Sequence, residues 1–185
     1  MQNPFLIGPT VYLRGLEVDD ARTVLPWFND PEVRCFLTRH RPMTLTEEEA
    51  FLRKVAEGPD NVALGVVVRA TDQLIGTAGL HQFDHRSRQA AFGISLGDKA
   101  AWGHGYGTEA TRLILGHAFE TLNLNRVWLH VYEYNTRGLR AYEKVGFRVE
   151  GRLRQDTFRD GRYWDTLVMG VLREEWESVG NEPAP

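Results

Sequence analysis

Three glycines at alternate positions precede a segment with helical periodicity in the stretch A-W-G-H-G-Y-G-T-E-A, from Ala101 to Ala110. The first turn of a helix has backbone N–H groups without intrahelical partners and lies at the positive end of the peptide dipole. Gly103, Gly105 and Gly107 keep side chains away from those groups. The stretch therefore predicts a site for phosphate oxygens at the beginning of a helix, with an ordinary glycine-rich turn as the alternative.

The rest of the composition is typical of one soluble globular domain. A chain of 185 residues suits a single core, and 42% hydrophobic and 25% charged residues are ordinary values for such a domain. Lys and Arg alternate with Asp and Glu along the chain, so no basic stripe predicts nucleic-acid binding. The N-terminal M-Q-N-P-F-L-I-G has no features of a signal peptide or membrane span, and we expect a cytoplasmic protein.

The cysteine and histidine pattern argues against disulfides and metals. Cys35 is the only cysteine, which excludes an internal disulfide, and it is poorly placed to act as a nucleophile. The six histidines lie apart, without the spacing of a metal site. We therefore expect no structural or catalytic metal.

Hydrophobic periodicity predicts an α+β order of elements. Strands are expected at Thr10–Leu16, Val62–Arg69, Leu74–Phe83, Gln89–Leu96 and Arg126–Tyr134, followed by a hairpin over Phe147–Val171 with a tight turn at Asp160–Gly161. Helices are expected from Asp19 with a break near Asp30, from Thr46 to Gly58, from the glycine run to Leu122, and over Thr136–Val145. For the second of these, Thr46 and Glu49 have the spacing of a capping box.

The order of these elements predicts one α+β domain over residues 1–177. Short connections among the early strands indicate an antiparallel meander, and strands alternate with helices in the second half. No internal repeat or linker divides the chain. Residues 178–185, which include V-G-N-E-P-A-P, are expected to form a disordered tail.

Glycine spacing separates the phosphate-binding schemes. A P-loop needs a glycine followed by Lys and then Ser or Thr, and the chain has none. A dinucleotide fingerprint needs a third glycine where Thr108 stands, and D-K-A-A-W separates the glycines from the preceding strand. Glu133, at the end of the next strand, keeps the dinucleotide scheme open as an alternative.

Three segments resemble the GNAT superfamily of acyl-CoA-dependent N-acetyltransferases. W-G-H-G-Y-G at Trp102–Gly107 matches both glycines of the superfamily motif, although Trp102 replaces the usual Gln or Arg, and W-G-x-G-Y-x-T-E-A is similar to the RimJ/RimL branch. N-T-R-G-L-R-A-Y-E-K-V-G-F at Asn135–Phe147 resembles the second cofactor segment, with Gly138 where RimL-like enzymes often have serine. E-G-R-L-R and F-R-D-G-R-Y-W-D-T-L-V-M resemble the closing hairpin of RimJ/RimL and of spermidine acetyltransferases, so the likeness covers roughly Thr10–Trp176.

The resemblance implies a mostly antiparallel sheet of about seven strands, flanked by helices and splayed between the fourth and fifth strands. It implies acetyl-CoA as cosubstrate, with the backbone of Ile94, Ser95 and Leu96 binding the pantetheine arm as an added strand would. A simple bulge is the alternative for that strand. The pyrophosphate is expected on the N–H groups of residues 103–108. The implied cofactor residues there are Trp102, Gly103, His104, Gly105, Tyr106, Gly107 and Thr108. We expect Trp102 to pack beside the cofactor and the glycine backbone to carry the pyrophosphate alone.

The resemblance also implies the chemistry. An amine must be neutral to attack a thioester, and the departing thiolate must gain a proton. Tyr142, seven residues after Asn135, is the implied acid and cofactor contact, with core packing as the alternative. Asn135 is expected to hold the loop backbone or the pantetheine. His130 is the candidate base, with packing among aromatic residues as the alternative.

The acceptor remains open between a protein N-terminus, a polyamine and an aminoglycoside. The N-terminal helices, roughly Asp19–Glu57, and the Phe158–Trp164 segment are expected to flank the amine. Acidic residues on those helices could attract a cationic acceptor, or could simply form a solvated face. A homodimer is implied because relatives of the branch often dimerise, and a non-catalytic acyl-CoA sensor is the alternative of a different class.

Overall fold

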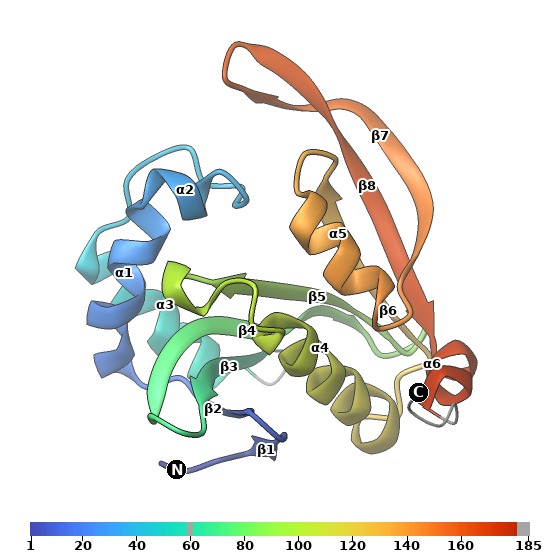
Figure 1. The fold of residues 1–185 in the computed structure, drawn as a ribbon, viewed down its shortest axis with the longest axis horizontal. Helices are drawn as coiled ribbons and strands as arrows, with labels where there is room; N and C mark the ends of the chain where they lie inside the picture. The colour runs from blue at the N-terminus through green and yellow to red at the C-terminus, as the bar shows by residue number, and fades with distance from the viewer. Residues whose placement is uncertain (59–60, 181–185) are drawn as a thin grey trace.

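The computed structural model describes residues 1–58 and 61–180, and its strands form one sheet with helices on both faces (Figure 1). The strands are β1 Leu6–Ile7, β2 Val11–Gly15, β3 Val62–Val68, β4 Gln73–Asp84, β5 Gln89–Leu96, β6 Arg126–Tyr132, β7 Arg148–Arg159 and β8 Arg162–Leu172. The helices are η1 Val18–Asp20, α1 Ala21–Asn29, α2 Pro31–Arg34, α3 Leu45–Glu57, η2 Lys99–Ala101, α4 Tyr106–Gly116, η3 His117–Thr121, α5 Thr136–Glu143 and α6 Arg173–Gly180.

The sheet has the strand order β1-β2-β3-β4-β5-β6-β8-β7. Every neighbouring pair is antiparallel except β5 and β6, which are parallel. The predicted α+β class and mostly antiparallel sheet are confirmed. The eighth strand is β1, whose two residues pair with β2 and are too few to show alternation in the sequence.

The two parallel strands separate after a short contact. β5 and β6 pair only through Gln89–Ala91 and Arg126–Trp128. Beyond these residues, no described strand pairs with the rest of β5 on the β6 side. The splay expected between the fourth and fifth predicted strands, which are β5 and β6, is therefore confirmed.

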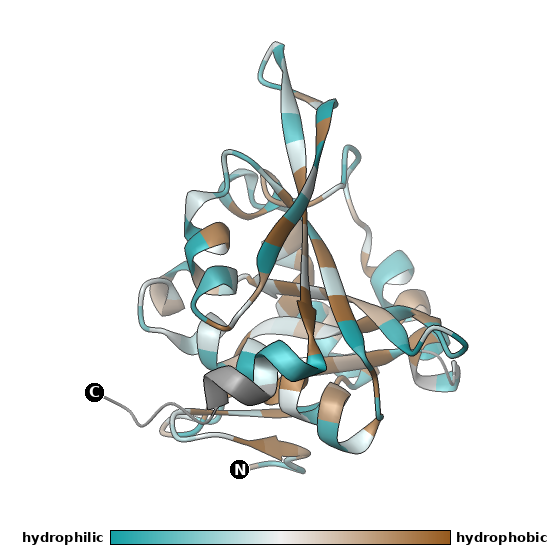
Figure 2. Cartoon of the chain, turned by 90° about the vertical axis from the view of Figure 1, so that its right-hand side faces the viewer, coloured by the Kyte–Doolittle hydropathy of each residue, from teal (hydrophilic) through white to brown (hydrophobic). Residues whose placement is uncertain are grey.

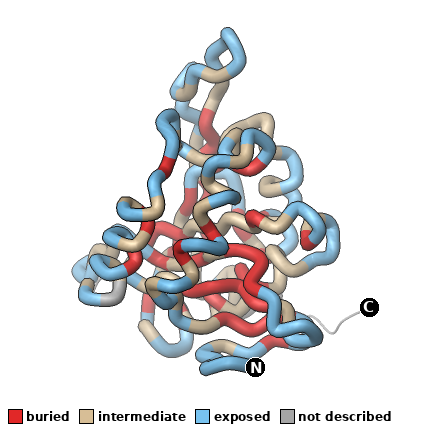
Figure 3. Tube along the Cα trace, turned by 90° about the vertical axis from the view of Figure 1, so that its left-hand side faces the viewer, coloured by how far each residue is buried: buried red, intermediate tan, exposed pale blue. Residues whose placement is uncertain are grey.

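Two hydrophobic cores lie on opposite faces of the sheet, because successive residues of a strand point to opposite sides. Val11 and Leu13 belong to the larger core with α4 and α5, whereas Tyr12 between them belongs to a smaller core with α1. Buried segments concentrate in the body of the molecule (Figure 3). The sheet is thus covered by α1 and α3 on one face and by α4 and α5 on the other (Figure 1).

Helix α3 begins two residues earlier than predicted. Its capping box consists of Thr44 and Glu47 instead of Thr46 and Glu49, although both pairs have the required spacing. The amide of Asn29 holds both backbone groups of Met43, at 2.9 Å for each hydrogen bond. A contact from another helix therefore fixes the residue before Thr44 and selects the earlier cap.

The β7–β8 hairpin extends beyond the body of the molecule (Figure 2). Its predicted turn at Asp160–Gly161 is confirmed, with φ angles of +52° and +78° that suit a tight two-residue turn. Arg159 beside the turn donates hydrogen bonds to the carbonyl oxygens of Arg34 and Leu37. The hairpin thus reaches across to the segment that follows α2.

The chain ends differ in detail from the prediction. Strand β6 ends at Tyr132, not at Tyr134. Residues 178–180, assigned to the disordered tail, fall within α6, and residues 181–185 lie outside the described residues. Every helix in the described ranges is too short or too polar to cross a membrane.

Candidate active site

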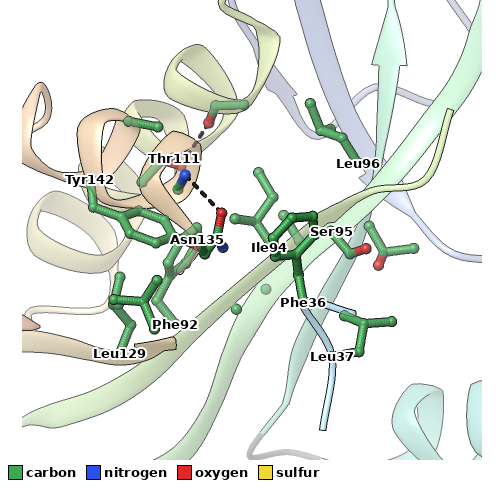
Figure 4. A pocket seen from close by; sticks show the side chains of 18 of the residues that line it. Phe36, Leu37, Phe92, Ile94, Ser95, Leu96, Thr111, Leu129, Asn135 and Tyr142 are labelled. Carbon is green, nitrogen blue, oxygen red and sulfur yellow. Dashed lines mark hydrogen bonds between the residues drawn. The ribbon is translucent and has the colours of Figure 1, made fainter. Parts of the chain in front are cut away.

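A cavity of about 1400 Å³ occupies the splay between β5 and β6. Residues from both faces of β5 line it, since Phe92 and Ile94 alternate with Gly93 and Ser95. Figure 4 shows Tyr142 and Asn135 on one side of β5 and Phe36 and Leu37 on the other. The cavity therefore connects the α4–α5 face with the α1–α3 face through the gap.

The glycine run forms one end of this cavity, at the beginning of α4. Gly103 and Gly105 have φ angles of +82° and +83°, and Gly105 is the N-cap residue of α4. A Cβ atom at either glycine would have no neighbour within 4 Å. Both residues are thus required by backbone conformation, and both leave open space over unpaired N–H groups, as an anion site needs.

Most predicted cofactor residues border the same cavity. These are Ile94, Ser95, Leu96, Trp102, Gly103, Gly105, Tyr106, Gly107, Thr108, Asn135 and Tyr142. His104 does not: it is exposed and stacks on Tyr106, with ring centroids 5.7 Å apart. The structure therefore brings together all predicted cofactor residues except His104.

Trp102 is tied to both sides of the gap. Its indole N–H donates to the Leu96 carbonyl oxygen at 2.8 Å, and the guanidinium of Arg137 lies 3.7 Å from its ring centroid. Arg137 belongs to α5, so the stacked pair joins the loop before α4 to the helix across the splay. The tryptophan ring thus packs against Arg137, and its indole N–H binds protein backbone.

Three basic residues in and directly after α5 were missed by the sequence reasoning. Arg137, Arg140 and Lys144 lie on one side of the helix region by spacing, and all three border the cavity. Their signal was present as cations three and four residues apart within the Asn135–Phe147 segment. They add positive charge to the cavity wall, in addition to the backbone N–H groups expected to bind the pyrophosphate.

The free edge of β5 is partly used by the protein itself. The Leu96 carbonyl points away from β4, toward Trp102. Alternate residues of an antiparallel strand direct their N–H and C=O groups to the same side, so the Ile94 groups also face the gap. Ile94 is therefore the residue best placed to pair with an extended ligand, and the Leu96 carbonyl is already occupied.

Tyr142 lies in the cavity wall with its ring in the core. Its ring packs edge-on against Phe92 and Phe147, and 9% of its surface is exposed. Burial raises the pKa of Tyr142 to about 12. No described residue accepts or donates a hydrogen bond at its hydroxyl, which leaves that group free to meet a ligand. The ring therefore packs in the core while the residue borders the cavity.

Asn135 caps the helix that carries Tyr142. Its side-chain oxygen accepts from the Gly138 N–H at 3.0 Å, which is the N-cap arrangement for α5. A Cβ atom at Gly138 would lie 2.6 Å from the Asn135 side-chain nitrogen. Glycine at position 138 therefore gives the cap its room, and the contact that the structure shows for Asn135 is this cap of the α5 backbone.

Two histidines border the α1–α3 side of the cavity. His130 is exposed and its ring is tilted against that of Trp128, with centroids 5.2 Å apart, instead of being enclosed among aromatic residues. His81 on β4 was missed by the sequence reasoning because nothing in the sequence pairs β4 with this site. Burial lowers the pKa of His81, which keeps its imidazole neutral at pH 7. Either imidazole can accept a proton there.

Long-range contacts hold the wall formed by the segment after α2. The Tyr134 hydroxyl donates to the Cys35 carbonyl oxygen at 2.7 Å, and the ring of Phe36 lies 6.2 Å from that of Tyr134. Burial raises the pKa of Tyr134 to about 12, so this donor stays protonated. Trp164 of the hairpin packs edge-on against Tyr134. The predicted flanking role of the N-terminal helices and the hairpin thus has a structural basis.

The geometry unites a splayed parallel strand pair, a glycine-rich helix start and a tyrosine on the following helix. Residues 10–148 match the family model described as Acetyltransferase (GNAT) domain. The chain belongs to the GNAT acetyltransferase family.

Similar proteins agree with the family. The Uncharacterized N-acetyltransferase p20 of Bacillus licheniformis is 29% identical over 89% of this chain and 93% of its own length. The Spermidine N(1)-acetyltransferase of Vibrio cholerae is 29% identical over 89% of this chain and 94% of its own. The crystal structure of spermidine N-acetyltransferase from Vibrio cholerae in complex with CoA and spermine superposes with a TM-score of 0.84 and 26% identity, over 91% and 98% of the two chains.

As a GNAT member, the protein is an acyltransferase that uses acetyl-CoA as cosubstrate. These relatives are named as an uncharacterized N-acetyltransferase and a spermidine acetyltransferase, and they do not assign the chain to the RimJ/RimL branch. Across the described ranges, no group of three or more His, Cys, Asp or Glu side chains could hold a metal ion.

Proposed function

We propose that this protein moves the acetyl group of acetyl-CoA to a primary amine by direct attack of the amine on the thioester carbonyl. A C–N bond forms and the C–S bond breaks, with no covalent enzyme intermediate. The observation that carries the proposal is the continuous cavity through the β5–β6 splay, with the glycine site at one end and Tyr142 in its wall. Such a cavity lets two substrates approach from opposite faces of the sheet.

The donor is held, in this proposal, by groups on the α4–α5 side. The N–H groups of residues 103–108 and the cations of Arg137, Arg140 and Lys144 bind the phosphates. The Ile94 backbone pairs with the pantetheine arm as an extra strand would. Acetyl-CoA supplies an acetyl group already activated as a thioester, so the protein needs no nucleophile of its own.

Tyr142 donates to the departing sulfur. Its raised pKa keeps the hydroxyl protonated across the physiological range. A group so weakly acidic favours hydrogen bonding to the developing thiolate, with full proton transfer only as the C–S bond breaks. Asn135 positions this hydroxyl indirectly, by capping α5.

The amine loses its proton on the α1–α3 side. His130 is the proposed acceptor, and His81, neutral at pH 7, is the second imidazole on that side of the cavity. The resemblance to RimJ/RimL supports a protein N-terminal α-amine as acceptor, together with a homodimer. The spermidine acetyltransferases among the relatives support a small polyamine.

Release of free thiol from acetyl-CoA tests the activity. The panel contains peptides with different N-termini, spermidine and related amines, and an aminoglycoside, each with mass spectrometry of the acetylated product. We expect turnover with at least one primary amine. Tight binding of acetyl-CoA without release on any acceptor would instead support an acyl-CoA sensor. Protection from thermal unfolding by NAD(H), and not by acetyl-CoA, would instead support dinucleotide binding at the glycine run.

A further inference from the structure

Glu48 is a buried carboxyl group without a hydrogen-bond partner. It is 1% exposed, on the first turn of α3, and its Oε2 atom has no partner among the described residues. Other polar groups nearby are paired, as in the capping box of Thr44 and Glu47 and the contacts of Asn29 with Met43. Burying an unpaired carboxylate is unfavourable, so its presence needs a reason.

The Glu48 side chain borders the cavity on the α1–α3 side. Phe51 and Val55 follow it at helical spacing and border the same space. The Oγ1 atom of Thr166 is also buried and unpartnered, and Thr166 borders the cavity as well. These buried polar atoms without partners thus lie where a ligand could supply their hydrogen bonds.

The sheet opposite α3 has a row of small residues. Ala63, Gly79 and Gly93 are register partners on β3, β4 and β5, and they share one face because paired residues point the same way. A Cβ atom at Gly93 would meet only His81, at 3.6 Å. The row leads from β3, next to α3, to the edge of β5 at the splay. Two strand spacings separate its ends, roughly 10 Å.

The surroundings of Glu48 favour a cation on a slender chain. Phe28, Phe36 and Phe51 border this part of the cavity, and aromatic rings attract alkylammonium groups. Arg39 is the positive charge that acts on Glu48. Its guanidinium lies 6.0 Å from the centroid of the Phe28 ring. Among the described residues, Arg39 and Glu48 form no ion pair. The carboxylate is therefore open to a cationic ligand.

We propose that Glu48 binds a second ammonium group of the amine acceptor while the first reacts at the splay. The acceptor class is an aliphatic amine with two cationic groups separated by an apolar spacer that lies over Ala63, Gly79 and Gly93. This inference rests on the proposed acetyl transfer, and it makes Glu48 a residue that determines acceptor specificity. A monoamine of the same length would leave Glu48 unpaired and bind more weakly.

Matched amines and matched variants test the proposal. The amines are 1,6-diaminohexane and hexylamine, and the variants are Glu48→Gln and Glu49→Gln. Glu49 is the neighbouring residue, whose carboxylate pairs with Arg53 on the helix surface, so its substitution makes the same chemical change away from the cavity. Calorimetric binding to the protein saturated with CoA reads recognition without turnover, and steady-state kinetics read KM and kcat.

We expect Glu48→Gln to weaken diamine binding and raise its KM about tenfold, with kcat within about twofold and hexylamine unaffected. Glu49→Gln should change neither the binding nor the KM of either amine. Equal effects on both amines, or no effect on the diamine, would overturn the role of Glu48. Diamine binding that depends on Glu48 without any acetyl transfer would uphold the recognition site and refute the proposed function. Cooperative thermal unfolding of Glu48→Gln, at or above the temperature at which the natural protein unfolds, excludes misfolding as the cause.

Discussion

The two sides of the cavity are built in different ways. On the α4–α5 side, the candidate donor site comes from two continuous segments, Ala101–Ala110 and Asn135–Phe147, and relies on backbone groups exposed by glycine. On the α1–α3 side, the candidate acceptor site comes from side chains far apart in the sequence. Its wall depends on contacts such as Tyr134 with Cys35 and Arg159 with Leu37, across 99 and 122 residues.

This difference shows how one fold can retain the same donor site while its acceptor site varies. Backbone groups at a helix start bind phosphate whatever the neighbouring side chains are. Side-chain walls on separate elements can change independently without disturbing that site. The variants below should therefore divide into those that affect acetyl-CoA and those that affect the amine.

The largest effect is expected from Gly105→Val. The new side chain would occupy the open space over the phosphate site, and we expect acetyl-CoA to bind about 100-fold more weakly by calorimetry. Gly161→Val is the control, since Gly161 has φ +78° and equally open space at the hairpin turn. Both variants carry similar backbone strain, so a loss of acetyl-CoA binding in Gly105→Val alone would locate the phosphate site at the start of α4. Comparable affinity for acetyl-CoA in the two variants would contradict that location.

Tyr142→Phe is expected to lower kcat about tenfold, equivalent to ~1.4 kcal/mol of barrier. The ring that packs on Phe92 and Phe147 is retained, so the affinity for acetyl-CoA should stay unchanged. Steady-state kinetics with calorimetric binding separate the two quantities. Unchanged kcat would refute the role as proton donor and leave only the packing role.

Glu48→Gln should stabilise the fold in a pH-dependent way. Burial raises the pKa of Glu48 above its ordinary value of 4.5, so the folded state holds its proton to higher pH than the unfolded state. The free energy of unfolding therefore falls as pH rises above 4.5 and levels off above the raised pKa. We expect the variant to match the natural protein near pH 4 and to be about 1–2 kcal/mol more stable at pH 7.

Urea unfolding at several pH values measures this difference. Glu49→Gln on the helix surface serves as the control, with an expected change of only a few tenths of a kcal/mol, about that of an exposed ion pair. A loss of stability in Glu48→Gln at pH 7 would mean that the carboxylate supports the fold. A gain would mean that the acceptor side maintains a group unfavourable to folding.

The smallest effect is expected from Trp102→Phe. This change keeps the stacking with Arg137 and removes the hydrogen bond to Leu96, and we expect about a threefold increase in the Kd of acetyl-CoA. Trp164→Phe is matched to it, because the Trp164 indole donates to the Arg159 carbonyl and its ring stacks with Arg162. Trp164→Phe should raise the KM of the amine and leave the Kd of acetyl-CoA unchanged. The reverse pattern would contradict the assignment of the donor and the acceptor to different sides of the cavity.

Several features could be predicted from the sequence because their causes are local. The turn at Asp160–Gly161 follows from residues that tolerate positive φ, and the start of α4 follows from its glycines. The helix that carries Tyr142 follows from the capping residue Asn135 and the helical periodicity of the segment after it. The meander and the splay were placed by short connections and by the family resemblance, respectively.

Other features could not be predicted because their causes lie elsewhere in the chain. Thr44 and Thr46 offer equally spaced capping boxes, and Asn29 on another helix selects the first. The presence of His81 beside the cavity depends on the pairing of β4 with β5, which no short motif specifies. The burial of Glu48, and not of its acidic neighbours Glu47 and Glu49, likewise depends on which side of α3 meets the sheet.

The sequence by itself determined the glycine-rich start of α4 and the class of the fold, because backbone conformation and helix polarity act over a few residues. Only the tertiary structure decided which side chains face the acceptor. Burial is a property of packed elements, and a carboxylate such as Glu48 differs from its exposed neighbour Glu49 only after α3 has docked on the sheet.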